Sequence, residues 1–151
     1  SWDDVKEIRK NWGGKVIIKG ILDAEDARAA VNVGADAIVV SNHGGRQLDG
    51  ALSAIKALPA IVDAVGDKAE VWMDGGIRSG QDVLRAIAMG AQGTLIGRAF
   101  LYGLGAGGQA GVTKALEIIH KELDLTMGLC GQSELRKVDS SILLAAESDH
   151  R

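Results

Sequence analysis

The stretch from residue 34 to residue 50 is Gly34-Ala35-Asp36-Ala37-Ile38-Val39-Val40-Ser41-Asn42-His43-Gly44-Gly45-Arg46-Gln47-Leu48-Asp49-Gly50. Its apolar run, residues 37–40, follows a Gly-Ala turn and passes into a polar loop rich in glycine. A short, uninterrupted apolar run of this kind predicts a strand that is buried on both faces. Such strands are typical of parallel sheets, so the stretch indicates an α/β fold.

The same pattern recurs along the chain. Gly90-Ala91 precedes Thr94-Leu95-Ile96 by the spacing that separates Gly34-Ala35 from residues 38–40, and two more apolar runs lie at residues 16–18 and 71–73. Helical spacing of apolar residues predicts helices between and after the strands, at residues 1–12, 24–33, 52–65 (with Pro59 inside), 80–89 and 112–126. Residues 133–137 fit a last helical turn, residues 104–111 stay unassigned, and the end from Ala145 is expected to fray. No linker divides residues 1–151, so we expect one domain of four parallel β/α units.

Composition limits the class of protein. The chain has 151 residues, of which 46% are hydrophobic and 25% charged, which is typical of a globular domain with a core. An isoelectric point of about 5.6 argues against a nucleic-acid-binding module. No apolar run approaches the roughly 18 residues that a membrane span requires.

The start of the chain and its one cysteine bear on processing and compartment. The chain begins with Ser1-Trp2-Asp3-Asp4, without Met and without a signal peptide, which indicates a processed chain or a piece of a longer one. Cys130 cannot form an internal disulfide, so we expect a reducing, cytoplasmic location, with peripheral attachment at the inner face of the membrane as an alternative. Its apolar neighbours Met127 and Leu129 predict that Cys130 is a buried small hydrophobe.

Polar and glycine-rich clusters follow all four predicted strands. They are Lys19, the pair His43 and Arg46, the run Asp74-Gly75-Gly76-Ile77-Arg78, and Gly97-Arg98. In parallel α/β folds, ligands bind at the carboxyl ends of the strands. We therefore expect the four clusters to meet in one ligand site.

The last two clusters have the composition of a phosphate site. Gly75 and Gly76 allow backbone N–H groups to approach an anion, and the helix expected to begin near Ser79 offers its positive end. Arg78 and Arg98 would supply charge-assisted contacts. The alternative is two ordinary turns with two surface arginines.

The second cluster has residues suited to acid–base chemistry. His43 lies next to Gly44, so a small ligand can approach it, and histidine suits a general base near neutral pH. Arg46, three residues on, can grip a carboxylate with two parallel hydrogen bonds. Lys19 either reaches the rim of the sheet or neutralises charge on a bound cofactor. The alternative for His43 is a loop histidine that caps a backbone group.

Ser41-Asn42-His43-Gly44-Gly45-Arg46-Gln47 resembles the active-site signature of the FMN-dependent α-hydroxy acid oxidases and dehydrogenases. This family includes flavin-type L-lactate dehydrogenase, lactate oxidase and glycolate oxidase. Lys19-Gly20, residues 74–78 and residues 96–98 are similar in order and spacing to the family's FMN-contacting segments. The resemblance spans residues 1–144 and implies the C-terminal half of a (β/α)8 TIM barrel, with the N-terminal half absent.

The resemblance also implies roles for individual residues. His43 would be the base and Arg46 would hold the substrate carboxylate, while Lys19 would lie near the N1–C2=O edge of FMN. Ser41 would contact the flavin or its ribityl chain. The remaining FMN contacts would come from Asp74, Gly75, Gly76, Ile77, Arg78, Gly97 and Arg98, and no metal is implied.

The implied activity is FMN-dependent oxidation of an L-2-hydroxy acid, with L-lactate as the first candidate, to the 2-oxo acid. The electron acceptor stays open among oxygen, a quinone and a cytochrome. A second hypothesis is a non-catalytic half-barrel that binds FMN or phosphate or serves structurally. A third is another FMN barrel, such as type 2 isopentenyl diphosphate isomerase or the IMP dehydrogenase group, which the pair His43 and Arg46 disfavours.

A half-barrel has consequences for assembly, because a complete β/α barrel takes about 250 residues. Four strands would leave two unpaired edges and an open inner face. We expect that face to include Ile17, Ile38, Val40, Val71 and Met73 or their neighbours. The isolated chain is therefore expected to be inactive and to pair with another half-barrel, which can be its own copy, or to belong to a homo-oligomeric enzyme.

Overall fold

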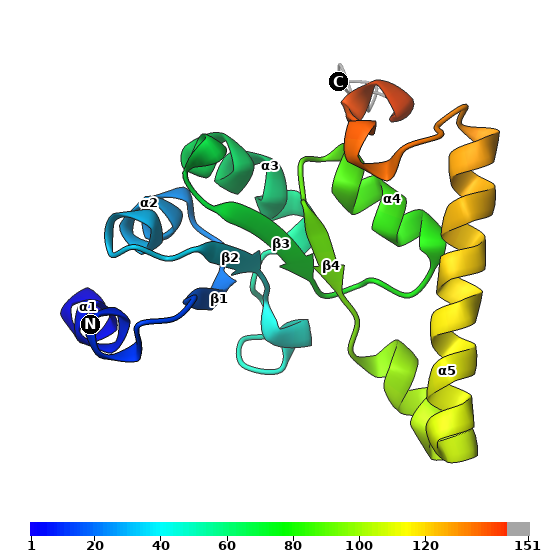
Figure 1. The fold of residues 1–151 in the computed structure, drawn as a ribbon, viewed down its shortest axis with the longest axis horizontal. Helices are drawn as coiled ribbons and strands as arrows, with labels where there is room; N and C mark the ends of the chain where they lie inside the picture. Colours follow the sequence, from blue (N-terminus) through cyan, green and yellow to red (C-terminus); the bar gives the residue numbers. More distant parts are fainter. Residues whose placement is uncertain (145–151) are drawn as a thin grey trace.

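The computed structural model describes residues 1–144, and the frayed end expected from Ala145 lies outside them. Helices and strands alternate along the described chain (Figure 1). They are α1 (Trp2–Trp12), β1 (Ile17–Ile21), α2 (Ala24–Asn32), β2 (Ala37–Val40), α3 (Ala54–Val65), β3 (Glu70–Asp74), α4 (Gly80–Ala88), β4 (Gly93–Leu95) and α5 (Arg98–Leu129). Short 3₁₀ turns lie at His43–Gly45, Gly66–Lys68, Leu135–Lys137 and Ser140–Ile142.

The four strands form one parallel sheet in the order β1-β2-β3-β4. This confirms the four parallel β/α units that the sequence predicted. Helices α2, α3 and α4 all lie on one side of the sheet, and α5 runs along the outside of α4 (Figure 1). Sequential strand order with helices on one side is the arrangement of an arc of a β/α barrel, whereas a doubly wound sheet has helices on both sides.

The helix-covered face of the sheet carries the main core. Strand residues on this face pack with Leu58 and Ile61 of α3, both fully buried. The strand residues are Ile38, Val40, Val71 and Met73, each at most 2% exposed. Our expectation for the open inner face gave these four residues or their neighbours, and it is wrong for these four but correct for the neighbours. Side chains alternate along a strand, so their sequence neighbours occupy the other face.

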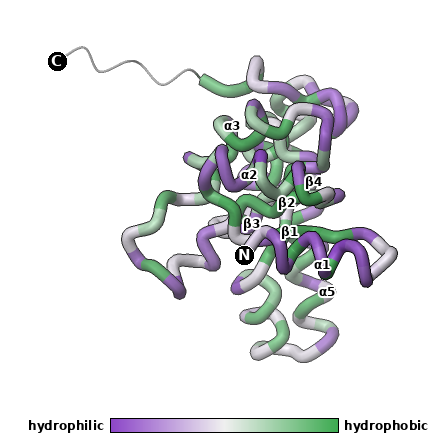
Figure 2. The backbone as a smooth tube through the Cα atoms, turned by 90° about the vertical axis from the view of Figure 1, so that its left-hand side faces the viewer, coloured by the Kyte–Doolittle hydropathy of each residue, from purple (hydrophilic) through white to green (hydrophobic). Residues whose placement is uncertain are grey.

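The opposite face of the sheet is covered by no helix of the described chain. The strand register places Lys19, Val39 and Trp72 side by side on it. Ile17 lies on the same face and is 46% exposed, which agrees with our expectation that it lines the open inner face. Only β2 is buried at every position, so the expectation of strands buried on both faces is correct for β2 alone. Figure 2 shows hydrophobic colour on the central strands and mostly hydrophilic residues in α1.

Local sequence explains where several helices begin and end. Ser1 and Asp4 cap the start of α1 reciprocally, and Gly13 ends it in the left-handed conformation at φ 70°. Helix α3 begins at Ala54, two residues later than expected, because Ser53 still has extended backbone. Pro59 lies inside α3, as expected.

Helix α5 is longer than the sequence indicated. The expected helix at residues 112–126 is the second part of an element that begins at Arg98, and the unassigned residues 104–111 are mostly helical. Non-helical backbone at Gly107 and Gly108 separates the two parts. They meet at Gly103 and Gly111, where a Cβ added to Gly111 would lie 1.9 Å from the Gly103 carbonyl oxygen. Glycines that serve such a close approach give no helix signal in a sequence.

Cys130 is exposed, so the expectation of a buried hydrophobe is wrong. Met127 packs against the cluster around α4, but Leu129, two residues further along the helix, is 89% exposed. Residues two apart lie on different sides of a helix, so the apolar neighbours did not share one face. In residues 1–144, no helix is both long and apolar enough to cross a membrane.

Candidate functional site

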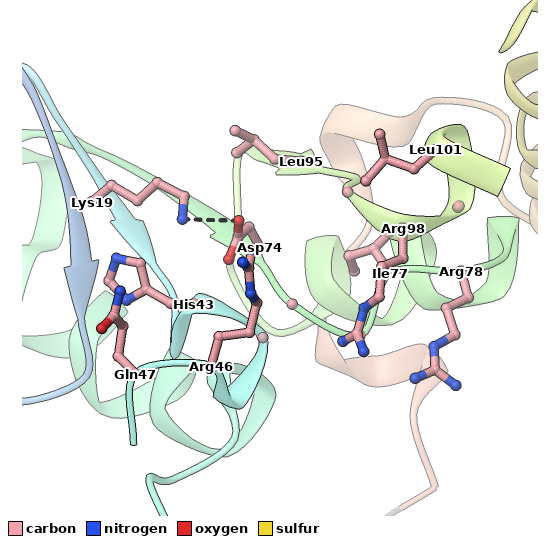
Figure 3. A pocket seen from close by; sticks show the side chains of 15 residues that line it. Lys19, His43, Arg46, Gln47, Asp74, Ile77, Arg78, Leu95, Arg98 and Leu101 are labelled. Atoms are coloured by element: carbon pink, nitrogen blue, oxygen red, sulfur yellow. Dashed lines mark ion pairs between the residues drawn. The ribbon is translucent and has the colours of Figure 1, made fainter. Parts of the chain in front are cut away.

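A pocket of about 440 Å³ lies at the carboxyl ends of the strands (Figure 3). Its volume falls within the range of small-molecule sites, which is about 300–1,000 Å³. Ten of the eleven predicted site residues line it, which are Lys19, His43, Arg46, Asp74, Gly75, Gly76, Ile77, Arg78, Gly97 and Arg98. The expectation that the four clusters meet in one site is therefore correct.

Ser41, the remaining predicted residue, lies beneath the pocket and is fully buried. Its hydroxyl donates to Asp74 Oδ1 and accepts from Lys19 Nζ at 3.1 Å and from the His43 backbone N–H at 3.1 Å. A hydroxyl has one donor and two lone pairs, so all its bonding capacity is used inside the protein. In this structure Ser41 supports three residues of the pocket wall and is not itself part of that wall.

Lys19 and Asp74 cross the floor of the pocket as an ion pair. Lys19 Nζ lies 3.1 Å from Asp74 Oδ2, and Figure 3 shows Lys19 on the side of His43 and Asp74 in the middle of the pocket. Both side chains are partly exposed, at 38% and 23%. The pair can therefore still turn polar atoms toward a ligand that enters the pocket.

His43 occupies a strained turn at the end of β2. Its φ of 55° makes it the one non-glycine residue with positive φ in the described chain, and Asn42 Oδ1 accepts from the next N–H, that of Gly44, at 3.0 Å. Within residues 1–144 the imidazole makes no hydrogen bond, so the alternative of a histidine that caps the backbone finds no support. Strained backbone of this kind concentrates at functional sites.

Arg46 follows His43 on the same turn and is exposed. Its guanidinium pairs with no carboxylate of the described residues. A guanidinium that lines a pocket without an internal partner can bind a carboxylate with two parallel hydrogen bonds.

The other end of the pocket carries two more arginines and the glycine turn. Figure 3 shows Arg78 and Arg98 at this end, away from Lys19 and His43. Gly75 and Gly76 have φ of 96° and 84°, a conformation that favours glycine. A Cβ added to Gly76 or to Gly97 would meet no atom within 4 Å, so the space beside this backbone is open to a ligand.

The start of α4, which we expected to attract an anion, already has internal partners. At the start of α4, Asp82 Oδ2 accepts from the N–H groups of Arg78 and Ser79 at 3.0 Å each. Glu122 Oε2 accepts from Gly80 N–H at 2.9 Å. Two carboxylates therefore already accept from the N–H groups at the start of α4, which disfavours our expectation that this end binds an anion.

The start of helix α5, in contrast, lies at the pocket. The helix begins at Arg98, after Gly97, with no side chain that caps its first N–H groups, and Gly97, Arg98 and Ala99 line the pocket. Uncapped N–H groups at a helix start attract anions. Sequence reasoning missed this helix end because the glycines between residues 103 and 111 hid the helical pattern.

The lining charges favour an anionic ligand. Four basic side chains, Lys19, Arg46, Arg78 and Arg98, face one carboxylate, that of Asp74. Within residues 1–144, no group of three or more His, Cys, Asp or Glu side chains has the arrangement of a metal site. The lining of the pocket thus suits negatively charged ligand groups.

Comparison with known families identifies the group to which this site belongs. The model of the FMN-dependent dehydrogenase family matches residues 1–145. The chain belongs to this FMN-dependent dehydrogenase family.

Curated relatives in this family are L-lactate dehydrogenases. The enzyme from Caulobacter vibrioides (strain NA1000 / CB15N) is 56% identical over 142 residues, which cover 94% of this chain and 37% of the relative. The enzyme from Pseudomonas syringae pv. syringae (strain B728a) is 56% identical over 146 residues, 97% of this chain and 38% of the relative. The chain therefore spans well under half the length of these relatives.

Solved structures of mandelate oxidase show the same fold. A variant with 2-hydroxy-phenylacetamide superposes with a TM-score of 0.89 at 49% identity, over 91% of this chain and 41% of that one. Another variant, with a monooxide FMN adduct, superposes with a TM-score of 0.87 at 50% identity, over 89% of this chain and 43% of that one. The four β/α units of this FMN-dependent dehydrogenase family member thus match part of FMN-dependent TIM-barrel enzymes.

Proposed function

We propose that residues 1–151 form the C-terminal half of a TIM-barrel oxidoreductase that uses FMN to oxidise an L-2-hydroxy acid, with L-lactate as the first candidate. One observation carries the proposal. A single pocket holds His43 at one end, Arg46 toward its middle, and Arg78, Arg98 and the α5 start at the other end. A base and a carboxylate-binding arginine suit acid–base chemistry on a small carboxylic acid. Arginines beside a helix start suit the phosphate of a cofactor.

The residues present fit FMN. The open backbone at Gly76 and Gly97, together with Arg78 and Arg98, would hold the phosphate. Asp74 lies between that end and His43, and its partner Lys19 lies on the side of His43, where the two would contact the ribityl chain and the flavin edge. When bound, FMN supplies the acceptor of the two electrons that leave the hydroxy acid.

His43 and Arg46 would act on the substrate itself. Arg46 binds the carboxylate and fixes the acid beside the turn, and His43 accepts a proton from the hydroxyl or from Cα. Lys19, held against Asp74 and Ser41, places a positive charge near the cofactor end of the substrate. Of these three side chains, Lys19 is held in place before the ligand arrives, by Asp74 and Ser41, which lowers the cost of its orientation.

The proposed assembly follows from the open face and the coverage of the relatives. The matched L-lactate dehydrogenase is more than twice as long as this chain, so residues outside the match would supply the opposite wall. Without that wall, Ile17 and its face meet water, and each Å² of apolar surface left exposed costs about 25 cal/mol. We propose that the open face pairs with another half-barrel, and that the electron acceptor is oxygen, a quinone or a cytochrome.

Sedimentation of the purified 151-residue chain tests the assembly directly. We expect association or binding of a hydrophobic dye at the open face. A soluble monomer that binds no such dye would contradict the pairing.

A non-catalytic, FMN-binding half-barrel is the second candidate, and one observation favours it. Arg78, Arg98 and the backbone at Gly76 and Gly97 all belong to this chain and line one pocket, which supports FMN binding without the missing wall. Titration of the chain with FMN separates the candidates when it is combined with an activity assay. Binding without turnover in every context would favour the second candidate.

The activity assay needs a complete barrel. We would replace the matching segment of Caulobacter vibrioides L-lactate dehydrogenase with residues 1–144, and refer to this hybrid protein as the chimera. The proposed function predicts that the chimera binds FMN and converts L-lactate to the 2-oxo acid. A chimera that is folded and yellow but inactive with L-lactate and other L-2-hydroxy acids would overturn it.

A further inference from the structure

Gly20 forms a β-bulge in strand β1. Lys19 pairs with Val39 and Ile21 pairs with Val40, so the register shifts across Gly20. The backbone there has φ of 106°, a conformation that side chains disfavour. The bulge places Lys19 in the pocket and Ile21 in the core, although residues two apart in a regular strand share a face.

The imidazole of His43 rests on this bulge. A Cβ added to Gly20 would lie 2.6 Å from His43 Cε1, 3.3 Å from Nε2 and 3.6 Å from Nδ1. The first distance is far inside van der Waals contact. Any residue other than glycine at position 20 would therefore displace the ring.

The backbone of His43 is held from a second side. Its N–H donates to Ser41 Oγ at 3.1 Å, and Ser41 is fully buried. This bond fixes the Cα position but leaves the side chain free to rotate. With no hydrogen bond to the imidazole in residues 1–144, contact with Gly20 restricts the ring.

We propose that Gly20 is a positioning residue for His43. Because Gly20 has no side chain, the imidazole can pack against its backbone, and this contact orients the ring toward the pocket. Gly20 touches neither substrate nor cofactor in this role and acts only through the ring. The inference rests on the proposed function for its catalytic consequence. The contact itself can be tested without activity.

A double-mutant cycle in the chimera tests the catalytic consequence. Gly20→Ala should lower kcat by about 10²-fold, because a displacement of about 1 Å in a reacting group costs that much. In a His43→Ala background, Gly20→Ala should cause no further loss, since there is no ring to displace. Equal losses in both backgrounds would overturn the proposal.

A second cycle measures urea unfolding of the 151-residue chain at one fixed chain concentration. Gly20→Ala should lower the unfolding midpoint, and His43→Ala should restore part of that loss by removal of the clash. Gly66→Ala is the matched control, because Gly66 also has positive φ (56°) but has no atom near an added Cβ. Gly66→Ala should lower the unfolding midpoint by the same amount in the parent and in the His43→Ala variant.

The two cycles separate this inference from the proposed function. If Gly20→Ala lowers the unfolding midpoint equally in the parent and in the His43→Ala variant, the proposed contact between Gly20 and the imidazole is wrong. A coupled unfolding cycle together with full turnover of the His43→Ala chimera would reject His43 as the base. The positioning role would then fail because the proposed function failed, while the contact would stand.

Discussion

The charged residues at the two ends of the parallel strands differ in whether they have partners within the protein. At the amino end, Asp36 accepts from Lys15 Nζ and from the Val16 backbone N–H, each at 2.8 Å, and lies 3.5 Å from Arg9 Nη1. At the carboxyl end, Arg46, Arg78 and Arg98 line a pocket and pair with no carboxylate of the described residues. One end satisfies its charges internally, and the other leaves cations for a ligand.

This difference separates residues that stabilise the fold from residues that bind. In β/α barrels the carboxyl end of the strands carries chemistry and the amino end carries stability. Substitutions at the carboxyl end should therefore change activity or ligand affinity more than stability. Substitutions at the amino end should do the reverse.

The largest effect is expected at His43. In the chimera, His43→Ala should lower the rate of lactate oxidation by on the order of 10²–10⁴-fold, because a general base contributes that much. Bound FMN should be unchanged, since the phosphate end of the pocket is intact. Near-normal turnover in a steady-state assay would remove His43 from the role of base.

Arg46→Lys should come next. A lysine keeps the charge but cannot form two parallel hydrogen bonds to a carboxylate. We expect a large rise in KM for lactate, with a fall in kcat if Arg46 also orients the reacting carbon. Steady-state kinetics of the chimera check this, and unchanged values would show that another residue holds the carboxylate.

Removal of either phosphate-end arginine should weaken FMN binding. Arg78→Gln or Arg98→Gln removes a charge-assisted hydrogen bond, worth about 1.5–3 kcal/mol, so the Kd should rise roughly 10- to 100-fold. Arg28→Gln is the control, because Arg28 lies on α2 and pairs with Glu25 outside the pocket. A flavin titration in which all three variants match the parent would place the phosphate elsewhere.

The smallest effect is expected at the amino end and concerns stability. The hydrogen bonds from Lys15 and Val16, with nearby Arg9, lower the pKa of Asp36 below its ordinary value. A lowered folded-state pKa stabilises the fold above the unfolded-state value, and this contribution is lost as pH falls through the folded-state value.

Asp36→Asn should therefore lower the Tm of the 151-residue chain near neutral pH. The difference from the parent should shrink as the solution is acidified. Thermal unfolding across an acidic pH series measures it. A difference that grows on acidification would contradict this reading of Asp36.

Much of this arrangement was predictable from local sequence. Continuous apolar runs gave the four strands, and the polar clusters after them gave ten residues of the pocket wall. Both signals are local, because strand burial and the position of a residue after a strand depend on neighbouring residues. The resemblance around residues 41–47 then led to the family that the comparisons show.

The errors lay where distant residues decide the outcome. Glu122 of α5 occupies the start of α4, forty-two residues earlier in the chain, so no local pattern shows that this helix end is taken. Ser41 lies under the pocket because Lys19 and Asp74, from the strands on either side, converge on its hydroxyl. Ile38 and Met73 lie on the helix-covered face of the sheet. The pairing between neighbouring strands decides which residues share that face, and a local sequence pattern does not show this pairing.

The most direct test is anaerobic mixing of the FMN-loaded chimera with L-lactate, followed by flavin absorbance, with the His43→Ala chimera measured alongside. If the unpaired cations at the carboxyl end serve hydroxy-acid oxidation, the parent flavin should bleach and an equal amount of 2-oxo acid should form. The His43→Ala flavin should stay oxidised while FMN remains bound. Bleaching at equal rates in both proteins, or no bleaching in a folded and FMN-loaded parent, would contradict the proposed site.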